Sequence, residues 1–113
     1  MYIIVNNDLS MGKGKIIAQC CHGVCDVIRR LATQKDEIYR SWLKDGQKKI
    51  VLKATQKQLI ALLNEFPNNA NVWCHGVYDA GLTQIPENSL TCVVFRPLAN
   101  NQIPEIIKSL KLL

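Results

Sequence analysis

The stretch DLSMGKGKIIAQCCH, residues 8–22, does most to decide the fold of this chain. It follows a short apolar run, YIIV at residues 2–5, which predicts a first strand, and it opens a long helical pattern. Its two glycines free the backbone at the turn, while Lys13 and Lys15 bring positive charge to the start of the helix. Because N–H groups and the helix dipole attract anions to a helix N-terminus, this turn predicts a site for a phosphate or carboxylate.

One side of the predicted helix is polar. On a helical wheel, Lys15, Gln19, His22 and Asp26 fall within about 60° of one another. Apolar residues gather on the opposite side, which we expect to face the core; they are Ile17, Cys20, Val24, Val27, Ile28 and Leu31. The helix is therefore expected to present an amine, an amide, an imidazole and a carboxylate in one stripe. An ordinary solvated face would account for Asp26. For His22, a solvated position and a functional one are equally good interpretations.

Length and composition predict one domain, residues 1–113, with one modest hydrophobic core. No stretch approaches the roughly 20 apolar residues that span a membrane, and the N-terminus lacks the layout of a signal peptide. We therefore expect a cytoplasmic protein that does not contact the membrane. The formal net charge of +5 suits an acidic partner such as RNA.

The cysteines predict reduced thiols and no metal site. Their number, five, is odd, and no secretory signal accompanies them. Cys21, His22, Cys25 and the neighbours Cys74 and His75 are the conceivable ligands. The paired CxxC spacing of zinc sites is absent, however, so we interpret the thiols as structural.

Strand and helix patterns alternate along the chain. Strands are expected at residues 2–6, 48–54, 71–77 and 90–95, and helices at 13–33, 36–45, 55–66 and from about 101 to 110. In the second helix, Ile38, Trp42 and Leu43 are expected to face the core. This order predicts an α/β fold with three layers, α/β/α, in which helices cover both faces of a four-stranded, mostly parallel or mixed sheet.

Two polar loops follow the first and third predicted strands, at residues 8–15 and 79–89. Ligands of open α/β sheets bind beyond the carboxyl ends of the strands. If these two strands are parallel neighbours, the loops converge. Lys15, Gln19 and His22 then face a second polar group, which comprises Asp79, Thr83, Ser89 and Thr91.

The two loops together resemble the signature of the type 2 peptidyl-tRNA hydrolases. The matching residues are NDLSMGKGK at 7–15, AQC at 18–20 with His22, and DAGLTQI at 79–85. The resemblance covers the whole chain, including LIALL at 59–63 and LKLL at 110–113. It implies the α/β/α fold, no metal or organic cofactor, and hydrolysis of the ester between a peptide and the 3′-terminal ribose of tRNA.

The resemblance also implies roles for individual residues. The catalytic positions fall on Lys15, Asp79, Thr83 and Thr91, and the substrate-binding positions on Asp8, Gly12, Lys13, Gly14, Gln19, His22, Gln84 and Ser89. Our hypothesis is that Lys15 stabilises developing negative charge and that Asp79 orients and deprotonates a water. Candidate phosphate contacts are Lys13, Arg29, Arg30, Lys48 and Lys49.

Some positions depart from the family pattern. Asn6 stands where the family often has Arg, and Leu82 replaces a residue that is commonly charged or polar. Phe95-Arg96-Pro97 replaces a more glycine-rich segment. We expect these changes to alter contacts with tRNA and to leave the matched catalytic positions intact.

Two other functions compete with the hydrolase. The first is a non-catalytic module that binds RNA or protein through the same fold. The second is a nucleotide-binding enzyme, which the spacing disfavours because Ile16 follows Lys15 where a phosphate-binding loop has Ser or Thr. Peptidyl-tRNA is the expected partner, and a homodimer is compatible with the sequence.

Overall fold

A computed structural model describes residues 1–80 and 85–113. Its sheet has the strand order β3-β4-β1-β2-β5, in which β1 and β2 are parallel and the other neighbours antiparallel. In chain order, the elements are β1 (Tyr2–Asn6), α1 (Lys13–Leu31), α2 (Glu37–Lys44), β2 (Ile50–Ala54), α3 (Gln56–Glu65), β3 (Cys74–Tyr78), β4 (Leu90–Phe95), a 3-10 turn (Asn100–Gln102), α4 (Glu105–Ser109) and β5 (Lys111–Leu112). The predicted α/β class and mixed sheet are confirmed.

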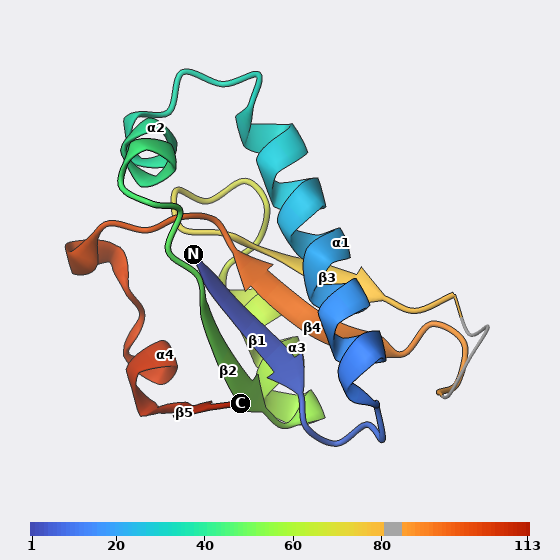
Figure 1. The fold of residues 1–113 in the computed structure, drawn as a ribbon. Coiled ribbons are helices and arrows are strands. Elements are labelled where there is room, and N and C mark those ends of the chain that lie inside the picture. Colours follow the sequence, from blue (N-terminus) through green and yellow to red (C-terminus); the bar gives the residue numbers. More distant parts are fainter. Residues whose placement is uncertain (81–84) are drawn as a thin grey trace.

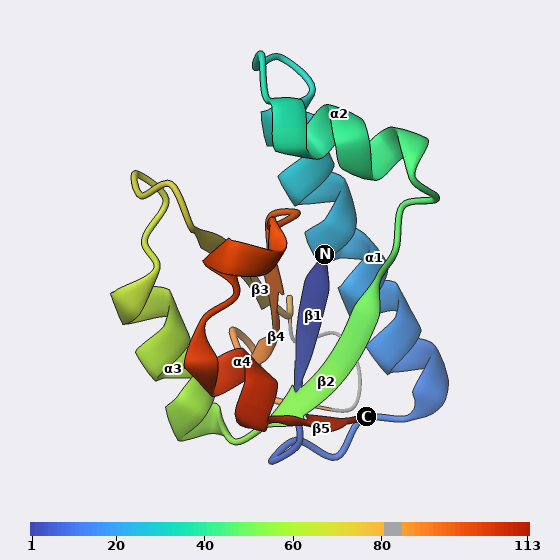
Figure 2. The ribbon, with the colours of Figure 1, turned by 90° about the vertical axis from the view of Figure 1, so that its left-hand side faces the viewer.

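Helices lie on both faces of the sheet, as predicted (Figures 1 and 2). Helix α1 covers one face, on which Ile3 and Val5 of β1 join Val27 and Leu31 in a buried cluster. Helices α3 and α4 cover the other face, where residue Ile4 joins a second cluster. Successive side chains of β1 thus point to opposite faces of the sheet and join two separate layers of the core.

Strands β1 and β3 are parallel but not neighbours, so this part of the prediction was wrong. Strand β4 lies between them and pairs antiparallel with both. Because each runs opposite to β4, β1 and β3 run in the same direction. The loops that follow β1 and β3 therefore still leave from the same end of the sheet, on either side of β4.

The packed side of α1 is rotated relative to the prediction. Ile17, which was expected in the core, is 63% exposed, whereas Gln19 from the polar stripe is buried. Gly23 is also buried, and a Cβ atom there would lie 2.5 Å from Cγ2 of Val94 and 2.8 Å from Cγ2 of Val77. The helix thus packs closely on β3 and β4 through Gly23. This orientation turns Gln19, a residue of the polar stripe, toward the sheet.

Helix α2 begins and ends at the predicted positions but buries a different residue. The Asp36 carboxylate caps its N-terminus by accepting from the Tyr39 N–H, and Gly46 follows it with a φ of +90°. Tyr39 is buried, whereas Leu43 is exposed, contrary to the prediction.

The C-terminal helix is shorter than predicted, and it is followed by a strand that was not predicted. A 3-10 turn and Pro104 precede α4, and since proline restricts the residue before it, a continuous helix from residue 101 does not form. Lys111 and Leu112 then pair with β2 as the fifth strand. A capping box begins α3, since the side chains of Thr55 and Gln58 each accept from the other's backbone N–H group. Within residues 1–80 and 85–113, no helix is long and apolar enough to cross a membrane.

Candidate active site

An ion pair between Lys15 and Asp79 lies where the two polar loops meet. Lys15 belongs to the first turn of α1, and Asp79 follows the last residue of β3. The Nζ atom of Lys15 contacts Oδ1 of Asp79, and the two side chains are only 11% and 5% exposed. The predicted convergence of the loops therefore brings these two residues, 64 positions apart, into direct contact.

A second pair of side chains supports Asp79 from behind. The Gln19 amide nitrogen lies 3.4 Å from Oδ1 of Asp79, and its amide oxygen accepts from the Thr91 hydroxyl at 2.8 Å. The Thr91 hydroxyl is also 3.0 Å from the carbonyl oxygen of Val77 and is fully buried. Because an ionised carboxylate only accepts hydrogen bonds, the Gln19 amide group is oriented with its nitrogen toward Asp79 and its oxygen toward the Thr91 hydroxyl. The single proton of that hydroxyl has two acceptors in reach, the Gln19 oxygen and the Val77 carbonyl.

The backbone of Asp79 is held by the end of the same loop. Its N–H donates to the Ser89 carbonyl at 2.9 Å, and its carbonyl accepts from the Asn88 N–H at 2.8 Å. The Ser89 hydroxyl donates in turn to the Pro86 carbonyl at 2.6 Å. Ser89 therefore secures the backbone at Asp79.

A cavity of about 600 Å³ opens beside the ion pair, between α1 and the end of β3. Besides Lys15, Gln19 and Asp79, it is lined by His22, Asp26 and His75. Lys15, Gln19, His22 and Asp26 all line this one cavity, which agrees with the polar stripe predicted for the helix. Such a cavity, apolar in part and with a few convergent polar groups, is typical of an active site.

The family model described as "Peptidyl-tRNA hydrolase PTH2" matches residues 1–113. The chain belongs to this family. It is 38% identical to the peptidyl-tRNA hydrolase of Methanococcus maripaludis over 112 residues, or 98% of this chain and 96% of the relative. It is 35% identical to that of Methanocaldococcus jannaschii, covering 100% and 98% of the two chains. The probable peptidyl-tRNA hydrolase 2 of Dictyostelium discoideum is 34% identical over 97% of this chain and 52% of its own length.

In this member of the PTH2 family, the sequence prediction overlooked an imidazole–carboxylate pair. The Nε2 atom of His75 lies 3.2 Å from Oδ2 of Asp26, and an Arg29 nitrogen lies 3.2 Å from Oδ1. His75 was considered only as a metal ligand, and Asp26 as a solvated residue. The spacing contained a partial signal, because residues 75 and 77 alternate along β3 and so share the face that packs under α1. His75 and Asp79, just after the strand, both line the cavity.

The other predicted substrate-binding residues lie apart from this cavity. Asp8 accepts from the N–H of Gln56 at 2.8 Å and lines a separate cavity of about 340 Å³, together with Ser89. Gly12 is the N-cap of α1, and Lys13 and Gly14 are exposed in its first turn. Thr83 and Gln84, like Leu82, lie outside the described residues.

The residues that depart from the PTH2 pattern have structural roles where they are described. Asn6 is buried, donates to the Leu90 carbonyl at 2.8 Å and accepts from the Asp8 N–H at 2.9 Å. Arg96 is also buried and forms an ion pair with Asp36. These two side chains therefore hold loops together inside the protein.

The cysteines form no disulfide and are unsuited to nucleophilic catalysis where they are buried. A hydrogen bond with Cys92 lowers the pKa of Cys20, while the same bond and burial raise the pKa of Cys92. Burial raises the pKa of Cys74 to about 12. Cys74 and Cys92 thus stay protonated at neutral pH. In the described part of the chain, no cluster of three or more His, Cys, Asp or Glu side chains is placed to hold a metal.

Proposed function

We propose that this chain hydrolyses the ester bond that joins a peptide to the 3′-terminal ribose of tRNA, releasing free tRNA and peptide. The observation that carries the proposal is the buried Lys15–Asp79 ion pair at the wall of the 600 Å³ cavity, in a chain of the PTH2 family. An amine and a carboxylate drawn from distant segments into one cavity form a common arrangement for hydrolytic chemistry. The relatives' names point to the same reaction.

The two charged groups, Asp79 and Lys15, have different roles in the reaction. The Asp79 carboxylate accepts a hydrogen bond from the attacking water and takes its proton as the new carbon–oxygen bond forms. The bond between the carbonyl carbon and the 3′ oxygen of the ribose then breaks, and this oxygen takes the proton back from Asp79 as the tRNA leaves. The Lys15 ammonium stabilises the negative charge that develops on the ester carbonyl oxygen. An ammonium group has three N–H donors, so it can contact the carboxylate and the oxyanion at once. An ester needs no stronger nucleophile than an oriented water.

Gln19 and Thr91 act on the reaction through Asp79. The Thr91 hydroxyl is fully buried, and its bonds go to Gln19 and to the backbone, so it positions Gln19. Gln19 in turn orients the carboxylate. His22, on the cavity wall, contacts the substrate. Thr83 stays a predicted catalytic position and Gln84 a predicted substrate contact, both on the resemblance alone.

We extend the proposal to the organisation of the protein. Residues 1–113 form one domain, which is supported by a single sheet that contains both β1 and β5. A cytoplasmic location is supported by the free state of all five cysteines. A homodimer stays a prediction, which sedimentation of the purified protein tests directly.

The test is release of tRNA from purified N-acetyl-aminoacyl-tRNA by the wild type and by the Lys15→Met and Asp79→Asn variants. Each variant is expected to lose about 10²–10⁴-fold in kcat/KM. The controls Lys44→Met and Glu65→Gln change exposed residues outside the cavity and should retain full activity. Near-normal turnover by Asp79→Asn would overturn its assignment.

The same assay separates the hydrolase from a non-catalytic module. If the wild type released no tRNA but bound it tightly and in a salt-sensitive way, the binding module would be the correct function. Turnover by the wild type that is lost in both variants would establish the enzyme and its cavity together.

A further inference from the structure

Two lysines stand directly opposite each other at the edge of the sheet. Lys53 of β2 pairs in register with Lys111 of β5. Directly opposed residues of an antiparallel pair project to the same face, and like charges in these positions are destabilising. Among the described residues, no acidic side chain forms an ion pair with either lysine. The fold therefore maintains two adjacent positive charges without a compensating carboxylate.

Several other basic residues of the described chain are engaged within the protein. Ion pairs occupy Arg29, Arg40, Arg96 and Lys108. The Arg30 guanidinium lies 4.0 Å from the centre of the Trp73 ring, and the Lys49 ammonium lies 5.0 Å from that of Trp42. Lys53 and Lys111 form neither an ion pair nor an aromatic contact, which is also true of some exposed lysines such as Lys35 and Lys44. What distinguishes Lys53 and Lys111 is that they lie opposite each other in register.

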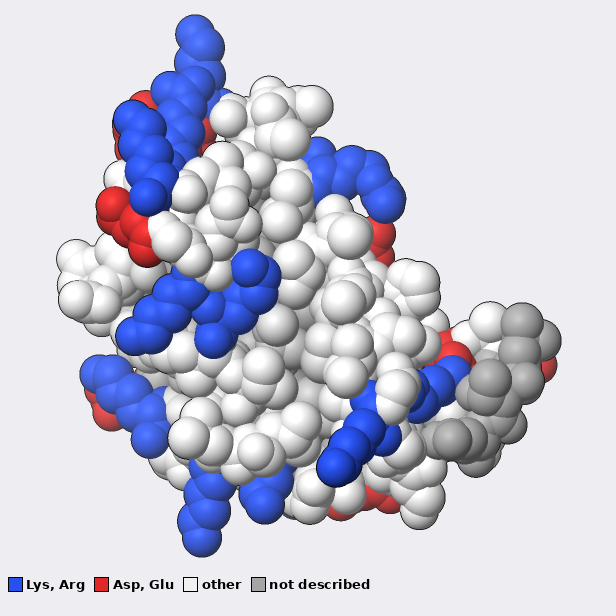
Figure 3. Space-filling view, viewed as in Figure 1, with Lys and Arg blue, Asp and Glu red and all other residues white. Residues whose placement is uncertain are grey.

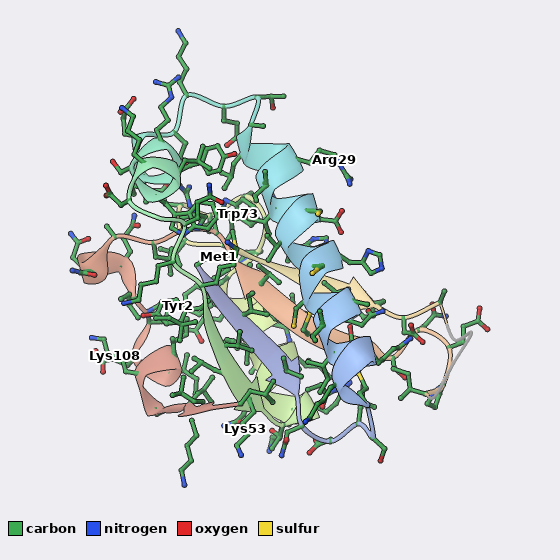
Figure 4. The ribbon with its side chains drawn as sticks, viewed as in Figure 1. Met1, Tyr2, Arg29, Lys53, Trp73 and Lys108 are labelled. Atoms are coloured by element: carbon green, nitrogen blue, oxygen red, sulfur yellow. The ribbon has the colours of Figure 1, made fainter. Side chains whose placement is uncertain are left out.

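The lysine pair faces the same side of the sheet as the active site. Lys53 is opposite Val5 in register and two residues from Val51, and both valines belong to the core beneath α1. Helix α1 packs mainly on β3 and β4, so β2 and β5 lie beyond its edge (Figure 1). Lys53 and Lys111 line a shallow hollow of about 220 Å³ at the end of the sheet, which also reaches Gln58 of α3 and Ser109 of α4. Figure 4 shows Lys53 at the lower end of β2, far from Arg29 and Trp73.

The loop between β1 and α1 connects this hollow to the active site. The Asn7 N–H donates to the Ala54 carbonyl at 2.9 Å, which places the start of the loop against the end of β2. The loop ends in Lys13 and Lys15 at the start of α1. Figure 3 shows Lys and Arg side chains in the lower part of the molecule, with some acidic atoms between them at the lower edge. The acidic residue of this loop, Asp8, already accepts from the Gln56 N–H.

We propose that Lys53 and Lys111 bind backbone phosphates of the tRNA acceptor arm as it leaves the active site, a proposal that rests on the function proposed above. Phosphate removes the repulsion between the two ammonium groups and accepts hydrogen bonds from both. The path runs from Lys15 past Lys13 to the lysine pair, along the carboxyl ends of β1 and β2. The arm thus crosses this edge of the sheet and does not follow α1 toward Arg29.

The test compares Lys53→Gln/Lys111→Gln with the control Lys35→Gln/Lys44→Gln. The control removes the same number of charges from exposed lysines outside the hollow. Two substrates are used: N-acetyl-aminoacyl-tRNA and the same ester on a CCA trinucleotide, which lacks the acceptor stem. For the lysine-pair variant, we expect KM for the tRNA to rise several-fold with kcat unchanged, and the trinucleotide kinetics to stay at wild-type values. The slope of log binding constant against log salt should fall by about 2, or about 1 for each lysine.

Thermal unfolding distinguishes this role from a structural one. Because removal of opposed like charges relieves repulsion, the Tm of the lysine-pair variant at low salt should equal or exceed that of the wild type. A wild-type KM and salt slope, an equal effect of the control, or a matching loss on the trinucleotide would each overturn the proposal. If the wild type hydrolysed neither substrate, the proposed function would fail, and the salt slope of tRNA binding would still decide whether the pair contacts phosphates.

Discussion

Two nearly buried ion pairs in the described part of the chain differ in what surrounds them. Lys15–Asp79 and Arg96–Asp36 each join segments at least 60 residues apart, and the four side chains are between 5% and 15% exposed. The first pair lines the 600 Å³ cavity, and the second does not. Charge and burial are therefore not enough to mark the active site.

The other hydrogen bonds of Asp36 and Arg96 are made with nearby backbone groups. The Asp36 carboxylate caps α2 through the Tyr39 N–H. The Arg96 guanidinium lies within bonding distance of the Pro97 and Asn71 carbonyls, at 3.2 and 3.5 Å. This pair joins α2 to the end of β4, which is a structural task. Asp79, in contrast, is supported by Gln19 and Thr91 and lines the 600 Å³ cavity.

The largest expected effect is on activity, in a double-mutant cycle at the first pair. If Lys15 and Asp79 act as one unit, Lys15→Met, Asp79→Asn and the double variant should lose similar activity, each about 10²–10⁴-fold. The measurement is kcat/KM on N-acetyl-aminoacyl-tRNA. Losses that multiply in the double variant would show that the two residues contribute independently.

The next largest expected effect is a loss of stability when the Arg96–Asp36 pair is broken. Asp36→Asn retains a good N-cap but removes the charge opposite Arg96, which leaves an uncompensated buried guanidinium. We expect the free energy of unfolding to fall by about 3 kcal/mol, with kcat unchanged, as measured by urea unfolding and by the tRNA-release assay. A loss of kcat in a folded variant would contradict the division between the two pairs.

The contrast also explains which parts the sequence could predict. Lys15 and Asp79 each follow a strand within a recognisable motif, and parallel strands bring such positions to one edge. Asp36 and Arg96 belong to no motif, and their partnership depends on where α2 packs. Strand β5 was missed because two residues are too short to show alternation, and its pairing depends on the open edge of β2.

The orientation of α1 could be predicted only approximately, for a physical reason. A helical wheel assigns the buried face by hydrophobicity, which favoured Ile17. The structure instead buries Gly23, because a residue without a side chain allows the closest approach to Val77 and Val94. That approach brings Gln19 against Thr91, so close packing of the helix and the polar site are one arrangement.

A third prediction concerns this close approach. In Gly23→Ala, the new methyl group would lie under 3 Å from methyl groups of Val94 and Val77, so that α1 must shift away from the sheet. We expect a loss of about 1–3 kcal/mol in the free energy of unfolding, together with reduced kcat. Ala61→Gly, at an exposed position of α3 away from the cavity, is the control for helix propensity and should keep its kcat. Wild-type kcat in Gly23→Ala would show that the active site does not depend on this contact.

The smallest effect is the pH dependence of the structural pair. Burial opposes the charge of the Asp36 carboxylate, but the Tyr39 N–H and the Arg96 guanidinium outweigh it and hold its pKa below the ordinary value of 3.8. The unfolded chain therefore binds a proton at Asp36 at a higher pH than the folded protein does. The stabilisation is complete above about pH 4 and is lost as the pH falls through the lowered pKa of the folded state. The difference in unfolding free energy between the wild type and Asp36→Asn should accordingly be constant from about pH 7 to 5 and shrink below about pH 4. Urea unfolding across this range measures it, and a difference that stayed constant down to the lowest pH would mean that Arg96 does not stabilise the charged carboxylate.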